Sequence, residues 1–85
     1  MAISTETLEA LHTRATAIGA VILEHKPSAY VSDDFHIVLA YKPKGSYQYA
    51  EFVTWLWANG SFHNGHYYTS DFESAAIDFE QRNEN

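Results

Sequence analysis

Residues 47–69, YQYAEFVTWLWANGSFHNGHYYT, have the composition of two long, aromatic-rich strands joined by a tight turn. Asn59-Gly60 matches a type I′ turn, because both central positions of that turn need a positive φ angle. A turn at this point places Trp57 opposite Phe62 in the predicted hairpin. Asn64-Gly65 is an alternative turn, which would shorten the hairpin and change its strand pairing.

The first register makes residues 62–68 one continuous strand. It pairs Phe52 with Tyr67 and leaves Gly65 inside the strand, where a glycine marks a bulge or a close approach of other atoms. We favour this register because it keeps both strands of the hairpin long.

Side chains of the first strand of the hairpin fall into two alternating sets. The set with the tryptophans holds Tyr49, Glu51, Val53, Trp55 and Trp57, and the other holds Ala50, Phe52, Thr54 and Leu56. The second set is small and aliphatic with one ring, which suits a face covered by helices. We therefore expect the tryptophans on the opposite, uncovered face. The inverse assignment, in which they form the core, is the alternative.

Two further elements are predicted before this hairpin. Ser4 or Thr5 can cap a helix with an apolar stripe that ends before Gly19; the stripe consists of Leu8, Leu11, Ala15 and Ile18. The following β-branched run predicts a strand to about His25, with one unbroken helix to Lys26 as the alternative. Residues 29–32 are expected to form a short strand before a turn at Asp33-Asp34, and alternation over residues 35–42 predicts the next strand.

The C-terminal residues predict a second helix. Ser70 and Glu73 have the spacing of a capping box. An apolar stripe follows at helical spacing, formed by Phe72, Ala75, Ala76 and Phe79. We predict one α+β domain over residues 1–85, with an antiparallel meander of three to four strands in the order α-β-β-β(-β)-α. Both helices are expected on one face of the sheet, which leaves the other face bare.

Charge and composition disfavour several classes of function. The net charge is −6, with eleven Asp and Glu against five Lys and Arg, so the chain lacks the cations that neutralise phosphates in nucleic-acid binding. The absence of cysteine excludes disulfides and thiolate zinc sites. No apolar run approaches the roughly 20 residues that cross a bilayer. The N-terminal residues also lack a signal-peptide pattern, and we expect a soluble cytoplasmic protein without membrane contact.

The chain shows no pattern of catalytic or metal-binding residues. There is no nucleophile elbow, phosphate-binding loop or carboxylate pair in a recognisable context. His63 and His66 lie three residues apart on a strand and are predicted to point to opposite faces. They could share a metal ion only if the turn at Asn64-Gly65 made them cross-strand neighbours. We predict no catalytic residue, no metal site and no cofactor, and therefore a protein that is not an enzyme.

The uncovered aromatic face is the basis of the functional expectation, because Trp and Tyr dominate the hot spots of protein interfaces. Its candidate interface or ligand-binding residues are Tyr49, Val53, Trp55, Trp57, Phe62, His66 and Tyr68. We expect a non-catalytic binding module or inhibitor that acts by protein contact as a homodimer. The alternative is a small-molecule-binding protein that stacks a planar or sugar-like ligand on its Trp and Tyr rings.

A third possible function is that of an acidic decoy for a nucleic-acid-binding protein. It requires one continuous acidic surface formed by Glu6, Glu9, Asp71, Glu73, Asp78 and Glu80.

A pattern in the C-terminal half resembles one that recurs in a loose group of small uncharacterised bacterial and mobile-element proteins. Its elements are a VTW strand, an Asn/Gly turn, a GHYY-like strand and a terminal A-x-D-F-x-x-R helix. The matching positions are Val53-Thr54-Trp55, Asn59, Gly65-His66-Tyr67-Tyr68, and Ala76, Asp78, Phe79 and Arg82. The resemblance implies a small α+β fold and supplies no activity.

Overall fold

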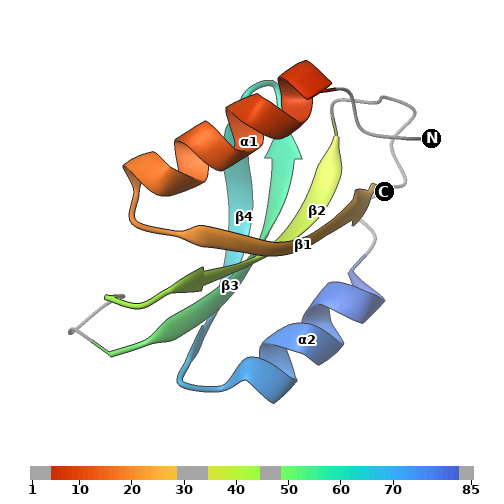
Figure 1. Cartoon of the computed structure of the whole chain (residues 1–85). Helices are drawn as coiled ribbons and strands as arrows, with labels where there is room; N and C mark the ends of the chain where they lie inside the picture. The colour runs from red at the N-terminus through yellow and green to blue at the C-terminus, as the bar shows by residue number, and fades with distance from the viewer. Residues whose placement is uncertain (1–4, 29–34, 45–48, 83–85) are drawn as a thin grey trace.

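The computed structural model describes residues 5–28, 35–44 and 49–82. Its elements are α1 (Thr5–Ala17), β1 (Val21–Pro27), β2 (His36–Lys42), β3 (Glu51–Ala58), β4 (Ser61–Thr69) and α2 (Phe72–Gln81). The strands form one antiparallel sheet in the order β1-β2-β3-β4 (Figure 1). The α+β class and the order of elements are therefore confirmed. The expected short strand at 29–32 and the turn at Asp33-Asp34 lie outside the described residues.

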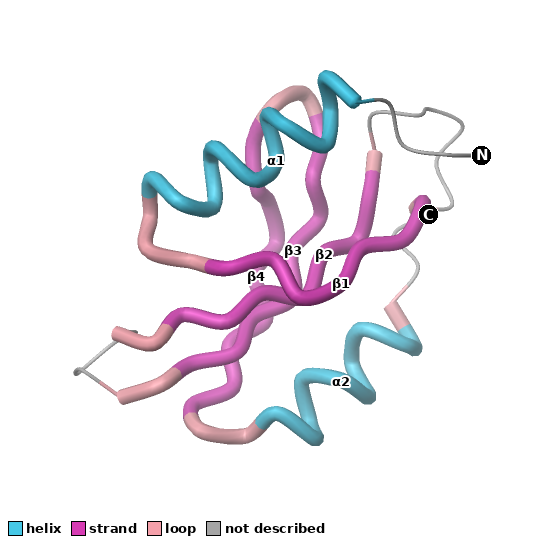
Figure 2. Tube along the Cα trace, viewed as in Figure 1, coloured by secondary structure: helices cyan, strands magenta, loops and turns pink. Residues whose placement is uncertain are grey.

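The two helices cover opposite faces of the sheet, so the predicted placement of both on one face is wrong (Figures 1 and 2). From α1, Leu11 and Ala15 join the clusters on one face. From α2, Ala75 and Phe79 pack on the other face with Ile37 and its neighbours. The physical reason is that β2 and β3 carry apolar side chains on both faces, and each face needs a cover to exclude water.

Trp55 and Trp57 lie on the face under α1, where they are 4% and 2% exposed. The expected bare tryptophan face is therefore wrong, and the inverse assignment holds. Trp57 packs with Leu11 and Val38, and Trp55 packs with Ala15. Because α1 contributes a leucine and an alanine as its buried residues, the indoles of the sheet supply the large apolar side chains of the layer beneath it.

The hairpin between β3 and β4 turns at the predicted position. Asn59 and Gly60 have φ angles of 53° and 78°, and Trp57 pairs with Phe62. The register then shifts between Thr54 and Leu56, opposite Asn64 and Gly65. This bulge makes Phe52 pair with Tyr68 and not, as predicted, with Tyr67.

Gly65 is both a bulge residue and a point of close approach, as predicted. A Cβ atom there would lie 2.7 Å from the Tyr67 hydroxyl oxygen and 2.8 Å from Trp55 Nε1. Real Cβ atoms do not come so near to other heavy atoms, so any larger residue would displace one of these rings.

The first helix ends at Ala17, and Gly19 follows it as the predicted C-cap glycine. The backbone N–H of Gly19 donates to the Thr16 carbonyl at 3.1 Å, and the N–H of Ala20 donates to the Ala15 carbonyl at 2.8 Å. Gly19 has a φ of 74°, which is typical of a glycine that closes a helix. This conformation excludes one unbroken helix to Lys26. Among the described residues, neither helix is long and apolar enough to cross a bilayer.

The second helix is capped by Asp71, not by the predicted box of Ser70 and Glu73. The Asp71 carboxylate accepts a hydrogen bond from the Ser74 backbone N–H at 3.0 Å. Ser70 has a φ of 53°, and its N–H donates to the Ala50 carbonyl at 2.8 Å. Ser70 therefore still belongs to the end of the sheet, and the helix begins one residue later than the capping box requires.

Candidate functional site

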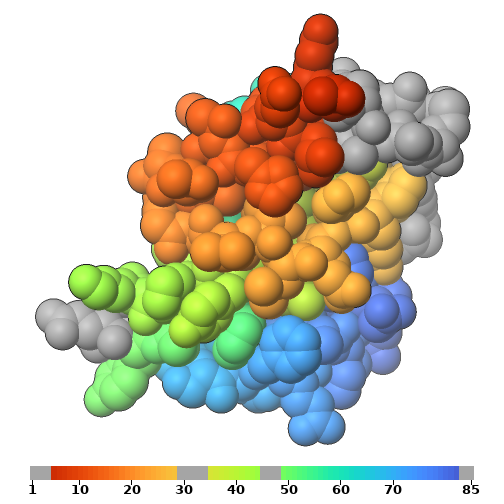
Figure 3. All heavy atoms as spheres, in the orientation of Figure 1, coloured from red at the N-terminus to blue at the C-terminus, as the bar shows by residue number. Residues whose placement is uncertain are grey.

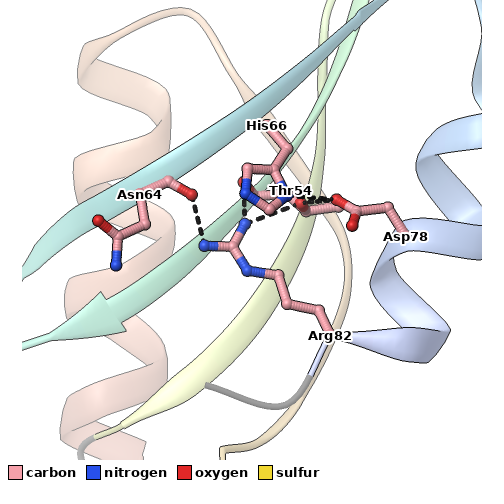
Figure 4. A network of polar contacts seen from close by, with 5 residues as sticks. All are labelled: Thr54, Asn64, His66, Asp78 and Arg82. Carbon is pink, nitrogen blue, oxygen red and sulfur yellow. Dashed lines mark hydrogen bonds and ion pairs between the residues drawn. The ribbon is translucent and has the colours of Figure 1, made fainter. Parts of the chain in front are cut away.

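A network of polar side chains joins α2 to β3 and β4 (Figure 4). Asp78 accepts hydrogen bonds from the Thr54 hydroxyl at 2.6 Å and from His66 Nδ1 at 2.9 Å. Arg82 donates through Nη1 to the carbonyl and hydroxyl oxygens of Thr54, at 2.7 and 2.9 Å. Its Nη2 donates to the carbonyl oxygen of Asn64. The network thus links three segments that are distant in the sequence.

The bulge in β4 provides one of the acceptors of this network. Because the register shifts opposite Asn64, its carbonyl oxygen is free to accept the hydrogen bond from Arg82. Arg82 is buried, and a buried guanidinium is tolerated when its N–H groups have acceptors. The bulge therefore supplies an acceptor for the buried arginine, and the arginine supplies a donor for a carbonyl of the bulge.

Electrostatics keep the centre of the network ionised. Burial alone would raise the pKa of Asp78, but hydrogen bonds from Thr54 and His66, together with the nearby charge of Arg82, lower that pKa below its ordinary value. Burial, followed by the charge of Asp78, raises the pKa of Tyr68. Asp78 is thus an anion at neutral pH, and Tyr68 is neutral.

An aspartate that orients an imidazole is also part of a catalytic triad, in which the hydroxyl of a nucleophile forms a hydrogen bond with the other ring nitrogen. Within the described ranges, no hydrogen bond places a hydroxyl on Nε2 of His66. The printed contacts of the network join α2 to β3 and β4, so the network holds the end of α2 on the sheet.

The sequence did not predict this network, although a signal for it was present. Asp78 and Arg82 are four residues apart and so lie on one face of a helix. They belong to the A-x-D-F-x-x-R pattern, while Thr54 and His66 belong to the VTW and GHYY patterns. Four of the side chains in that pattern therefore meet at one place beneath α2.

His63 and His66 do not lie on opposite faces as predicted. The bulge pairs them with Leu56 and Thr54, which share the face covered by α2. His63 Nε2 lies 3.1 Å from the Ala58 carbonyl oxygen, whereas His66 contacts Asp78. The described part of the chain contains no group of three His, Cys, Asp or Glu residues that could hold a metal ion.

The seven predicted interface residues do not form one surface. Val53, Trp55 and Trp57 are buried, and Phe62 is half-buried with its ring stacked on Trp55 at a centroid distance of 4.5 Å. Tyr49 is exposed and lies before β3. On the face of α2, His66 joins the polar network and Tyr68 is half-buried opposite Phe52. The sheet face we expected to be exposed is the core under α1.

An exposed apolar row does exist, but on the face of α2. Strand pairing places Val21 opposite Tyr41 and Tyr41 opposite Phe52. The ring of Phe52 lies 5.1 Å from that of Tyr41 and 5.2 Å from that of Phe72, between centroids. We call these four residues the Phe72 surface. Val21 and Phe72 are 54% and 50% exposed, so both ends of the row are open to solvent.

The Phe72 surface remains open because α2 begins beside it. The first turn of α2 supplies Phe72, and the buried residues Ala75 and Phe79 lie further along the helix. In Figure 3 the ends of β2 and β3, in yellow-green and green, border the light blue start of α2. Atoms of β1 fill the surface between the two helices in the same view.

This apolar surface continues along the outer side of α2. A shallow hollow of about 370 Å³ there is lined by Phe72, Glu73, Ala76, Ile77, Glu80 and Gln81. Ile77 is exposed like Phe72. The hollow therefore combines apolar side chains with acidic neighbours.

No protein-family model, curated protein or solved structure matches this chain. The candidate site is therefore defined by geometry and chemistry alone.

Proposed function

We propose that this protein is a cytoplasmic, non-catalytic binding module that acts by contact with another protein through the Phe72 surface. The observation that carries the proposal is the contiguity of Val21, Tyr41, Phe52 and Phe72, whose ends are about half exposed. Contiguous exposed apolar patches mark interaction sites on small proteins. A chain without cysteine needs no oxidising compartment, which supports the cytoplasmic location.

The composition of the surface supports a protein partner. Aromatic side chains contribute most of the binding energy in typical interfaces, and a surrounding polar rim excludes water. Here the aromatic row adjoins the hollow on α2, which carries the carboxylates of Glu73 and Glu80. This arrangement matches an apolar centre with a charged border.

The first partner to test is a second copy of the chain. A twofold dimer uses the same patch on both subunits, so it would cover Val21 and Phe72 of each. It would also bring Glu73 and Glu80 of the two copies near one another. Because salt screens repulsion between like charges, we expect self-association to strengthen with ionic strength. A different partner with a basic border would show the opposite dependence.

Sedimentation equilibrium at low and high salt tests the homodimer. Phe72→Ser should weaken association at least about tenfold, since burial of a phenylalanine contributes about 1.5–3 kcal/mol. Ile18→Ser is the matched control, because Ile18 is a comparably exposed apolar residue directly after α1. A wild-type protein that stays monomeric at millimolar concentration would exclude the homodimer. Equal effects of both substitutions would argue against the Phe72 surface.

A further inference from the structure

A second hollow, of about 450 Å³, lies between α1 and β4. Its lining includes Arg14, Ile18, Trp55, Ser61, Phe62 and Tyr67. Tyr67 pairs with Val53, which belongs to the face under α1. The hollow is therefore on the opposite side of the sheet from the Phe72 surface, and the proposed protein contact does not use it.

The aromatic side chains that line this hollow contact one another and so fix each other's orientation. The Trp55 indole N–H donates to the Tyr67 hydroxyl oxygen at 3.3 Å, and the two rings meet edge to face with centroids 6.4 Å apart. The ring of Phe62 stacks on the Trp55 indole, with ring centroids 4.5 Å apart. Gly65 permits the arrangement, because a side chain there would collide with Tyr67 and Trp55.

Tyr67 is 55% exposed, although its hydroxyl accepts a hydrogen bond from a buried indole. α1 lies closest to β1, the opposite edge of the sheet, and so leaves this part of β4 open. Bulges are over-represented at sheet edges and beside active sites, where they re-aim a side chain.

The polar groups of the hollow are hydrogen-bond donors. Arg14 Nη2 donates to the Ser61 hydroxyl oxygen at 3.3 Å, which leaves the other N–H groups of the guanidinium for a ligand. The hydroxyls of Ser61 and Tyr67 each accept one hydrogen bond, so each retains its own O–H proton to donate.

The lining contains no carboxylate, although acidic residues outnumber basic ones by eleven to five in this chain. Arg14 takes part in no ion pair with any other described residue. The hollow therefore combines aromatic rings with a guanidinium that forms no ion pair among the described residues, although Glu6 and Glu9 line a neighbouring hollow with Arg14.

We propose that this hollow binds an aromatic carboxylate. The planar ring of the ligand would pack on Phe62 and Tyr67, since offset and edge-to-face contacts between rings are favourable. Its carboxylate would accept hydrogen bonds from Arg14, because the guanidinium fork matches the two oxygens of a carboxylate. The hydroxyls of Ser61 and Tyr67 supply further donors at the same site.

The proposal is tested by titrating the full chain with 2-naphthoate and with 2-naphthalenemethanol, an uncharged probe of similar shape. Chemical shifts in ¹H–¹⁵N NMR spectra report the site. We expect saturable shifts at the Trp55 indole N–H and at Ser61, and about tenfold tighter binding of the carboxylate, as one charged hydrogen bond provides. Equal affinities, shifts confined to α2, or no saturable binding would overturn the proposal.

Arg14→Gln is the decisive variant. Arg14 is exposed, so the fold should persist, which far-ultraviolet circular dichroism checks. The variant should bind both probes with similar affinity, whereas Lys44→Gln, a control at an exposed position in the turn after β2, should keep the preference. A retained preference in Arg14→Gln would contradict the role of this arginine.

The ligand site and the protein contact can fail separately. Phe72→Ser should leave naphthoate binding unchanged, because Phe72 lies on the other face of the sheet. If the Phe72→Ser protein self-associates as strongly as the wild type and binds naphthoate, the proposed interface is wrong and the ligand site stands. Loss of naphthoate binding in the folded Phe72→Ser protein would contradict the separation of the two sites.

Discussion

The hydroxyl of Thr54, on β3, donates a 2.6 Å hydrogen bond to the carboxylate of Asp78, on α2. The same hydroxyl oxygen accepts a hydrogen bond from Arg82 at 2.9 Å. The small side chain of Thr54 thus connects an anion, Asp78, and a cation, Arg82, that lie one helical turn apart. This connection joins α2 to β3 beside the apolar contacts of Ala75 and Phe79.

Loss of the carboxylate should therefore destabilise the fold. We expect Asp78→Ala to lower the free energy of unfolding by about 2–3 kcal/mol, because it removes hydrogen bonds to a charged group and leaves their partners unsatisfied. Urea denaturation measures this change. Glu80→Ala, on the exposed side of the same helix, should change stability by less than about 0.5 kcal/mol. Similar effects of the two substitutions would show that the network does not stabilise the fold.

Trp55→Ala should unfold the protein or weaken it severely. The indole is 4% exposed, and removal of a buried aromatic side chain costs about 3–5 kcal/mol, a large share of the stability of a small domain. Thermal unfolding followed by circular dichroism gives the loss. Tyr49→Ala, at an exposed ring, should cost less than about 0.5 kcal/mol. A small loss for Trp55→Ala would mean that the indole is not part of the core.

Stability should fall when the pH drops below neutrality, because of His25. Burial, followed by the charges of His36 and His12, lowers the pKa of His25 below its ordinary value of 6.5. The unfolded chain then binds more protons than the folded chain once the pH falls below about 6.5. The contribution of neutral His25 is complete above that pH and is progressively lost below it.

Urea denaturation between pH 7.5 and 5.5 measures this dependence. His25→Gln should make stability less sensitive to pH over that range, because it removes one group that binds protons more strongly in the unfolded chain. An unchanged slope in this variant would assign the effect to other groups.

Asp71→Ala should lower the melting temperature more than Glu73→Ala does. The Asp71 carboxylate accepts the hydrogen bond from the Ser74 N–H at the start of α2, and loss of an N-cap side chain destabilises a helix. Asp71→Asn should retain most of the stability, since asparagine is an equally good cap. A larger loss from Glu73→Ala would restore the capping box that the sequence suggested.

Elements that depend on neighbouring residues could be predicted from the sequence. Asn59-Gly60 defines the hairpin turn, Gly19 ends the first helix, and Gly65 marks the bulge, because each provides a backbone conformation or a clearance that a larger residue resists. The order of helices and strands follows from the same local patterns. The sequence does not predict that Asp71 caps α2, because Ser70 bonds to Ala50, a distant residue in the sequence.

The faces of the sheet depend on packing between distant segments, and they could not be predicted in this way. Alternation along β3 places the tryptophans on one face and Phe52 and Leu56 on the other. Both sets are apolar, so the pattern does not indicate which helix covers which face of the sheet. The structure places α1 over the indoles and α2 over the other set. Local backbone chemistry thus specifies the elements of this protein, whereas long-range burial and the Asp78–Thr54–Arg82 contacts determine which surfaces remain exposed.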